Sequence, residues 1–183
     1  MSFIKIKDKT FRPFISAEEI HSRVKAVADK INHDMAGKNP LFLAVLNGSF
    51  MFAADLMRMV TIPSEISFVK LSSYEGTNST GKIKEVIGIN EDLEGRDVVI
   101  VEDIVDTGTT MMQMIEQLSA YHVASLHICT LLVKPGKLKV PLQIDYAAME
   151  IPNDFIVGYG LDYDEKYRNL SYVGVLKPEV YSD

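Results

Sequence analysis

Apolar residues are gathered into a few dense runs along the chain. Residues 41–46, 98–101 and 126–133 are almost wholly hydrophobic, and residues 66–72 form a further, less regular run. Runs without polar alternation are typical of strands that are buried on both faces. We therefore expect four central strands at these positions, with shorter strands at 155–157 and 172–176.

Three segments have the periodicity of helices instead. A capping box begins at Ser16, apolar residues then recur at helical spacing, and Gly37 is placed to end that helix. Residues 50–60 are apolar nearly all round, so this helix is either fully buried or partly covered by another subunit, and we favour oligomerisation. Residues 111–121 have one apolar stripe, which predicts a third helix packed on a core.

Strands that alternate with helices indicate an α/β domain with a largely parallel sheet. The chain has no internal repeat or Pro/Gly-rich linker, so we expect one domain over residues 1–183. Ligand sites in this fold class lie beyond the carboxyl ends of the strands. The residues that follow the run at 98–101 are therefore the first place to look for chemistry.

Composition narrows the class of protein. The chain has 183 residues, 47% hydrophobic and 24% charged, with a net charge of −6, which argues against a general affinity for nucleic acid. No stretch is apolar enough for a signal peptide or a spanning helix, so we expect no membrane association. The single cysteine, Cys129, lies in an apolar run and is interpreted as a buried strand residue, which suits a reducing cytoplasm.

Two acids and a turn rich in hydroxyls follow the run at 98–101. Glu102 and Asp103 are adjacent, and on their own they could equally be solvated loop residues. The next residues add a glycine and three hydroxyl groups at an expected helix start, where free backbone N–H groups form a phosphate cradle. Together they favour a sugar phosphate that carries a diphosphate; the cradle residues are Asp106, Thr107, Gly108, Thr109 and Thr110.

Two other motifs are excluded for this segment. A Walker loop needs G-x-x-x-x-G-K-[ST], which is absent. The triplet that starts at Asp106 also occurs in aspartic proteases, but the chain has no second copy to share a proton with it.

Residues 98–110 (VVIVEDIVDTGTT) resemble the signature of the type I phosphoribosyltransferases, specifically the hypoxanthine-guanine branch. Further resemblances follow in order at 46–49, 72–84, 131–134 and 150–168, so the likeness covers about residues 41–176. It implies a mostly parallel central sheet flanked by helices, with a small hood built from terminal segments.

The resemblance also implies an activity in purine salvage. Such an enzyme moves the phosphoribosyl group of phosphoribosyl pyrophosphate to N9 of hypoxanthine and guanine, giving IMP or GMP and pyrophosphate, with Mg²⁺ as cofactor. A xanthine-preferring transferase and a nucleotide-sensing regulatory protein of the same fold stay open as alternatives. Members of this kind are expected to form homodimers or homotetramers.

By resemblance, different signature residues bind different parts of the sugar phosphate. Glu102 and Asp103 contact the ribose hydroxyls and the water ligands of Mg²⁺, and residues 106–110 hold the 5′-phosphate. Asp106 is also the candidate general acid/base, near purine N7. Such a role is typically worth about 10²–10⁴-fold in rate.

The remaining roles are also carried over by resemblance. Lys134 would donate to purine O6, because a polar group left unpaired by the wrong base is how such sites discriminate. Without the resemblance, Lys134 is a solvated strand-end lysine, Phe155 and Ile156 are strand core, and Arg168 is a surface arginine. The purine is expected to stack on Phe155 and to contact Asp162 and the backbone of Ile156. Asp162 is also expected to bind Mg²⁺ directly, and Gly48 and Arg168 to bind pyrophosphate. Ser73 and Tyr74 are expected to belong to a lid that closes over the site.

One position departs from the family pattern. Many members have a basic residue before the glycine of the pyrophosphate loop, whereas this chain has Asn47. The family often has a cis peptide there, and we considered it for the bond between Asn47 and Gly48. The role of Asn47 is left open.

Overall fold

The computed structural model describes residues 4–6, 9–73 and 83–176. In this part of the chain the central sheet has the strand order β5-β4-β3-β6-β7-β8. Its neighbours pair in parallel from β4 to β8, and β5 is antiparallel to β4. The strands are β3 (Leu41–Leu46), β4 (Glu65–Ser73), β5 (Ile83–Ile87), β6 (Asp97–Val105), β7 (Ser125–Val133) and β8 (Tyr146–Glu150).

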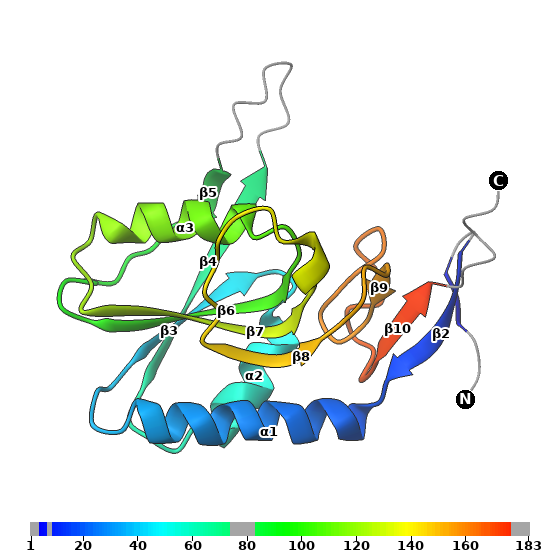
Figure 1. The fold of residues 1–183 in the computed structure, drawn as a ribbon, viewed down its shortest axis with the longest axis horizontal. Coiled ribbons are helices and arrows are strands. Elements are labelled where there is room, and N and C mark those ends of the chain that lie inside the picture. Colours follow the sequence, from blue (N-terminus) through cyan, green and yellow to red (C-terminus); the bar gives the residue numbers. More distant parts are fainter. Residues whose placement is uncertain (1–3, 7–8, 74–82, 177–183) are drawn as a thin grey trace.

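Helices cover both faces of this sheet (Figure 1). α1 (Ala17–Asp34) and α2 (Phe50–Met59) lie on one face, and α3 (Thr109–Ser119) lies on the other. Alternate residues of β3 divide between the two layers: Phe42 packs in the cluster of α1 and α2, and Leu43 packs in that of α3. This double burial explains why the run at 41–46 is continuously apolar.

The capping box forms as expected. Ser16 Oγ accepts a hydrogen bond of 3.1 Å from the N–H of Glu19 and so caps α1. The Met35 N–H closes the last turn on the carbonyl of Ile31, and Gly37 follows with a φ of +78°. The helix prediction is confirmed, with its end a few residues before the glycine.

α2 is not fully buried within the chain. Phe52, Ala53 and Leu56 are buried, whereas Phe50 keeps 39% of its surface exposed. Of the two interpretations of this apolar helix, complete burial inside one chain is therefore wrong.

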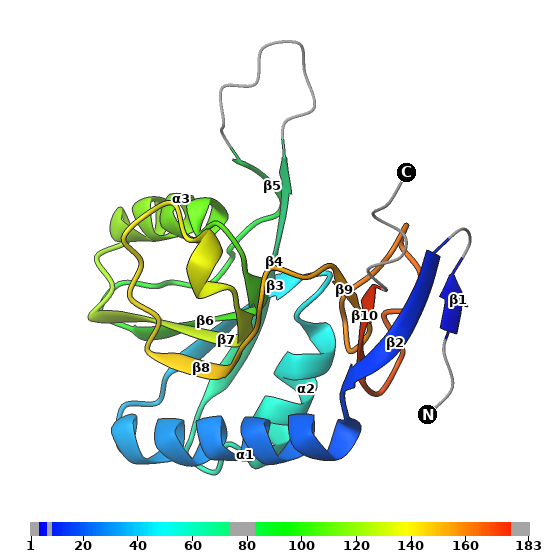
Figure 2. The ribbon, with the colours of Figure 1, turned by 45° about the vertical axis from the view of Figure 1, so that its right-hand side comes forward.

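A second, antiparallel sheet stands beside the first (Figures 1 and 2). Its order is β1-β2-β10-β9, so it combines both ends of the described chain. This is the hood of terminal segments that the family resemblance implies. Only β9 and β10 were expected from the hydrophobic pattern; the strands are β1 (Ile4–Ile6), β2 (Lys9–Ile15), β9 (Ile156–Val157) and β10 (Val173–Leu176).

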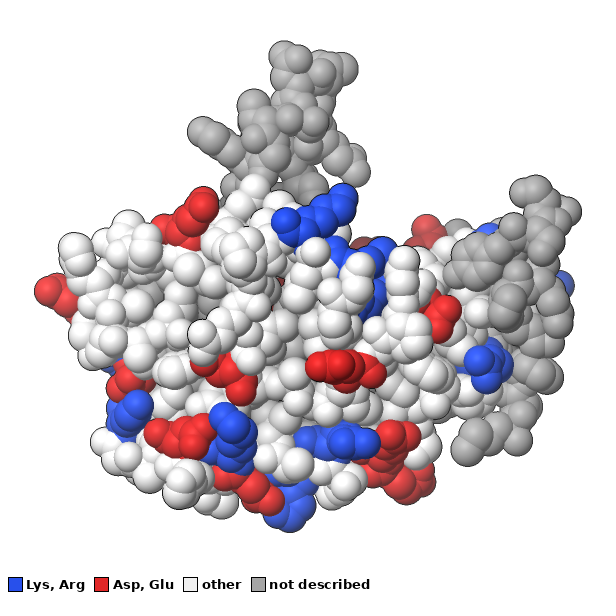
Figure 3. Space-filling model, viewed as in Figure 1, with Lys and Arg blue, Asp and Glu red and all other residues white. Residues whose placement is uncertain are grey.

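Charges of both signs are intermixed on the face seen in Figure 3, above all along α1. Ion pairs one helical turn apart contribute to this pattern, such as Lys25 with Asp29 at 2.6 Å and Lys30 with Asp34 at 2.8 Å. Over the described residues, no helix has the length and apolarity that crossing a membrane requires.

Candidate active site

Loops from both sheets meet at the carboxyl end of β3. A Cβ atom added to Gly48 would lie 1.7 Å from Asp103 Oδ2, and one added to Gly160 would lie 2.0 Å from the Gly48 carbonyl oxygen. A side chain at either glycine would force its neighbour to move. The loop after β3, the acids of β6 and the hood are therefore in direct contact.

The backbone of the loop after β3 contains a cis peptide bond. The bond joins Leu46 to Asn47. Whether the bond between Asn47 and Gly48 is cis was left open, and among the described residues the cis bond is the one that precedes Asn47.

The two adjacent acids belong to the strand itself. β6 continues to Val105, beyond the end expected at residue 101, so Glu102 and Asp103 are held in the sheet and are not free loop residues. Glu102 Oε1 accepts from the Asp103 N–H at 3.1 Å, and Asp103 Oδ1 accepts from the Ile104 N–H at 2.7 Å.

Burial penalises the charged form of both carboxyl groups. It raises the pKa of Glu102 well above its ordinary value, and the neighbouring Asp103 charge adds to this effect. Burial also raises the pKa of Asp103, although hydrogen bonds and the positive charge of Arg168 act in the opposite direction. The pair therefore favours a counter-charge or hydroxyl donors next to it.

The cradle residues form a tight turn into α3. Gly108 has a φ of +78° and caps the helix, and a Cβ there would lie 2.9 Å from Val140 Cγ2. The Thr107 hydroxyl lies 3.2 Å from that of Thr109. The turn lines a cavity of about 150 Å³, whose walls also include Glu102, Asp106, Thr110 and Met111. The N-terminus of a helix suits an anion, because the first backbone N–H groups of a helix have no partner within it.

Two lysines flank the carboxylate of Asp106. Lys134 Nζ lies 3.9 Å from Asp106 Oδ2, and Lys137 Nζ lies 3.1 Å from the same oxygen. Burial is the main cause that lowers the pKa of Lys134. The sequence reasoning assigned Lys134 and missed Lys137, whose only signal was its place three residues further on, in a turn at Pro135–Lys137.

The hood contributes an aromatic group and an ion-pair cluster. Phe155 is 43% exposed, and its ring lies edge-on to Tyr163 with centroids 5.8 Å apart. Ile156 is buried next to it in β9. Arg168 binds Asp162 Oδ1 at 2.8 Å and the Gly160 carbonyl at 2.9 Å, so it is not a free surface arginine.

The expected lid falls mostly outside the described part of the chain. Ser73 is the last residue of β4, and Tyr74 lies outside the described residues.

Comparison with known proteins decides the family. The phosphoribosyl transferase domain family matches residues 16–164. The chain belongs to this family. A hypoxanthine-guanine phosphoribosyltransferase of Streptococcus thermophilus is 44% identical over 168 residues, covering 91% of this chain and 93% of that protein. The protein of the same name from Mycobacterium tuberculosis is 41% identical over 174 residues, covering 91% and 86%.

The similarity extends to three dimensions. The crystal structure of a hypoxanthine phosphoribosyltransferase from Staphylococcus aureus superimposes with a TM-score of 0.87, at 41% identity and with 94% of each chain covered. The predicted fold and the resemblance to the hypoxanthine-guanine branch are confirmed. These relatives do not favour the xanthine-preferring enzyme or the regulatory protein.

The acids of this phosphoribosyltransferase fit a hard cation, but not as one cluster. In the described ranges, no group of three or more His, Cys, Asp or Glu side chains could hold a metal ion. The protein alone therefore does not gather Glu102, Asp103 and Asp162 into one cluster of metal ligands. Mg²⁺ is commonly bound by one or two carboxylates together with substrate phosphates and water, and buried paired carboxylates suit that arrangement.

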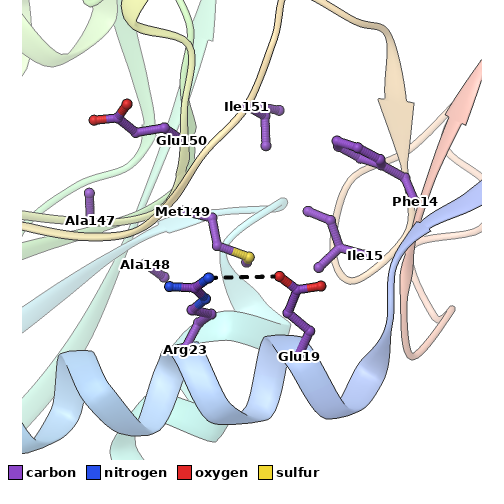
Figure 4. Close-up of a pocket in the computed structure, with 9 residues that line it drawn as sticks. All are labelled: Phe14, Ile15, Glu19, Arg23, Ala147, Ala148, Met149, Glu150 and Ile151. Atoms are coloured by element: carbon purple, nitrogen blue, oxygen red, sulfur yellow. Dashed lines mark ion pairs between the residues drawn. The ribbon is translucent and has the colours of Figure 1, made fainter.

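A larger cavity lies away from these residues. About 420 Å³ opens between α1, β2 and β8 (Figure 4). Arg23 is the only cation among its lining residues, and Glu19 faces it at 3.9 Å. The smaller cavity is the candidate active site, because it is lined by Glu102, Asp106 and the turn that begins α3.

Proposed function

We propose that this phosphoribosyltransferase transfers the phosphoribosyl group of phosphoribosyl pyrophosphate to N9 of hypoxanthine and guanine, releasing pyrophosphate. The observation that carries this proposal is the position of Asp106. Its carboxylate lies between the cradle and the buried ammonium of Lys134, 3.9 Å away. One group thus borders both the sugar-phosphate site and a donor suited to a 6-oxo group.

Lys134 would select 6-oxopurines over adenine in the purine site. Only 8% of this side chain is exposed, so a base that leaves its ammonium without an acceptor loses binding energy. Hypoxanthine and guanine place a carbonyl oxygen at position 6, whereas adenine places an amino group there. Phe155 would stack on the ring, and the backbone of Ile156 would bind its edge.

Asp106 would exchange a proton at purine N7 while the ribose forms its bond to purine N9 and loses its bond to pyrophosphate. Residues 106–110 would hold the 5′-phosphate, and Glu102 and Asp103 would bind the ribose hydroxyls. Positioning of this kind turns a bimolecular encounter into an intramolecular one. Gly48 would present its backbone to the pyrophosphate, and Arg168 its guanidinium, whose fork suits phosphate oxygens.

Mg²⁺ belongs to the same proposal. Asp162 would hold it directly, and Glu102 and Asp103 through water. Bound there, the ion would neutralise charge on the leaving diphosphate. Ser73 and Tyr74 would close over the diphosphate and exclude water.

We also propose a homodimer or homotetramer in the cytoplasm. The support is an apolar surface next to α2, where Phe50 is 39%, Ile66 38% and Phe68 42% exposed. Ile66 and Phe68 pair with Phe42 and Ala44 in the sheet, so they lie on the same face as α2. Light scattering behind size exclusion would test this, with Phe68→Glu expected to reduce the measured mass.

The activity itself is tested by product formation. Purified protein, hypoxanthine, phosphoribosyl pyrophosphate and Mg²⁺ are expected to yield IMP on chromatography, and excess chelator is expected to stop the reaction. Substrate depletion without IMP would contradict the proposal, and so would full activity in chelator.

A further inference from the structure

The two carboxylate oxygens of Asp106 have different surroundings. Oδ2 faces both lysines, with Lys137 Nζ at 3.1 Å and Lys134 Nζ at 3.9 Å. Oδ1 is buried, and within the described part of the chain it has no hydrogen-bond partner. Because Oδ1 is buried, the hydrogen bond that Lys137 makes to this carboxylate is made at Oδ2.

The two lysines also differ from each other. The Lys134 side chain is 8% exposed and that of Lys137 is 37% exposed. Only Lys137 lies within hydrogen-bond distance of Asp106. The charge of Lys137 also disfavours the charged form of Lys134, which together with burial lowers the pKa of Lys134.

We propose that Lys137 is a positioning residue, which holds Asp106 Oδ2 and so leaves Lys134 available to donate to purine O6. The proposal rests on the proposed transferase function and adds a residue to it.

The geometry gives the reason. If Lys137 is removed, Lys134 is the nearest ammonium to Oδ2, and it needs to move by less than 1 Å from its 3.9 Å separation to make the bond that Lys137 makes at 3.1 Å. A lysine drawn to Asp106 is no longer directed at the purine. Asp106 also loses the hydrogen bond that Lys137 makes to its Oδ2.

The test compares Lys137→Met with Lys137→Arg and with Lys139→Met. Lys139 is exposed and lies two residues further along the same loop, so its substitution changes the net charge equally. We expect Lys137→Met to lose about tenfold in kcat/KM for hypoxanthine, whereas Lys139→Met stays within about twofold of the wild type. Lys137→Arg keeps the cation and is expected to recover most of the activity.

A double-mutant cycle separates positioning from a general structural effect. In an Asp106→Asn background, Lys137→Met is expected to cause no further loss, because Lys137 acts through that carboxylate. Equal losses in both backgrounds would overturn the proposal, as would a Lys137→Met variant that matches Lys139→Met. A wild-type protein without transferase activity would instead overturn the proposed function itself, and this proposal with it.

Discussion

A single methyl group at Gly48 should displace one of the two adjacent acids of the site. The added Cβ would lie 1.7 Å from Asp103 Oδ2, whereas an ordinary van der Waals contact begins at 3.4 Å, so the carboxylate must retreat by the difference of 1.7 Å. The other carboxylate oxygen of Asp103, Oδ1, accepts a hydrogen bond of 2.7 Å from the Ile104 N–H, which opposes this movement. Gly48 has no positive φ, so the effect of alanine there is steric and not due to backbone strain.

Two magnitudes follow for Gly48→Ala. Overpacking of this kind costs about 1–3 kcal/mol of unfolding free energy. A misplacement of about 1 Å in a catalytic site can cost on the order of 10²-fold in rate. We therefore expect kcat/KM to fall by about two orders of magnitude while the folded state persists.

The assay is initial-rate IMP formation, with urea denaturation to measure stability. Gly136→Ala is the matched control, because Gly136 has no positive φ and no atom within 4 Å of its added Cβ. If Gly48→Ala retains kcat/KM within about twofold of Gly136→Ala, the close approach of Gly48 to Asp103 has no catalytic meaning and the reasoning fails.

Three further predictions concern the acids and Lys134. Asp106→Asn should bind both substrates and lose about 10²–10⁴-fold in turnover, and near-normal kcat would remove its acid/base role. Lys134→Met should weaken hypoxanthine far more than adenine in steady-state rates, and equal losses would contradict the O6 contact. The raised pKa of Glu102 means that the folded state binds a proton at this carboxyl more tightly than the unfolded state does. The stability that this proton contributes is therefore fully present below pH 4.5, the ordinary value, and is lost as the pH rises through the raised value. The stability of Glu102→Gln relative to wild type, from urea unfolding without Mg²⁺, should therefore increase with pH, and a constant difference would refute the assignment.

The elements with the strongest pattern could be predicted from sequence. β3 and β7 are buried on both faces, so their apolar runs have few alternatives, and the Ser16 cap fixes the start of α1 through a local hydrogen bond. β8 and β2 were missed. Each is only partly buried, with exposed and polar residues between the buried ones, so neither has a clear hydrophobic pattern.

Part of the candidate site could also be predicted from sequence, and part could not. The acids and the cradle are contiguous in sequence, so their motif can be recognised from the sequence alone. The approach of Gly48 to Asp103 and the contact of Gly160 with Gly48 join residues far apart in the chain, and no local pattern encodes them. Lys137 was missed for a related reason, since only the turn after β7 brings its ammonium to Asp106.

The central claim is that the segment from Val98 to Thr110 and Lys134 form one site for a sugar phosphate and a 6-oxopurine. The most direct test is pyrophosphate release with hypoxanthine, guanine, xanthine and adenine, each with phosphoribosyl pyrophosphate and Mg²⁺. We predict that hypoxanthine and guanine have the highest kcat/KM and that adenine is rejected. Comparable turnover of adenine, or no release with any base, would contradict the claim.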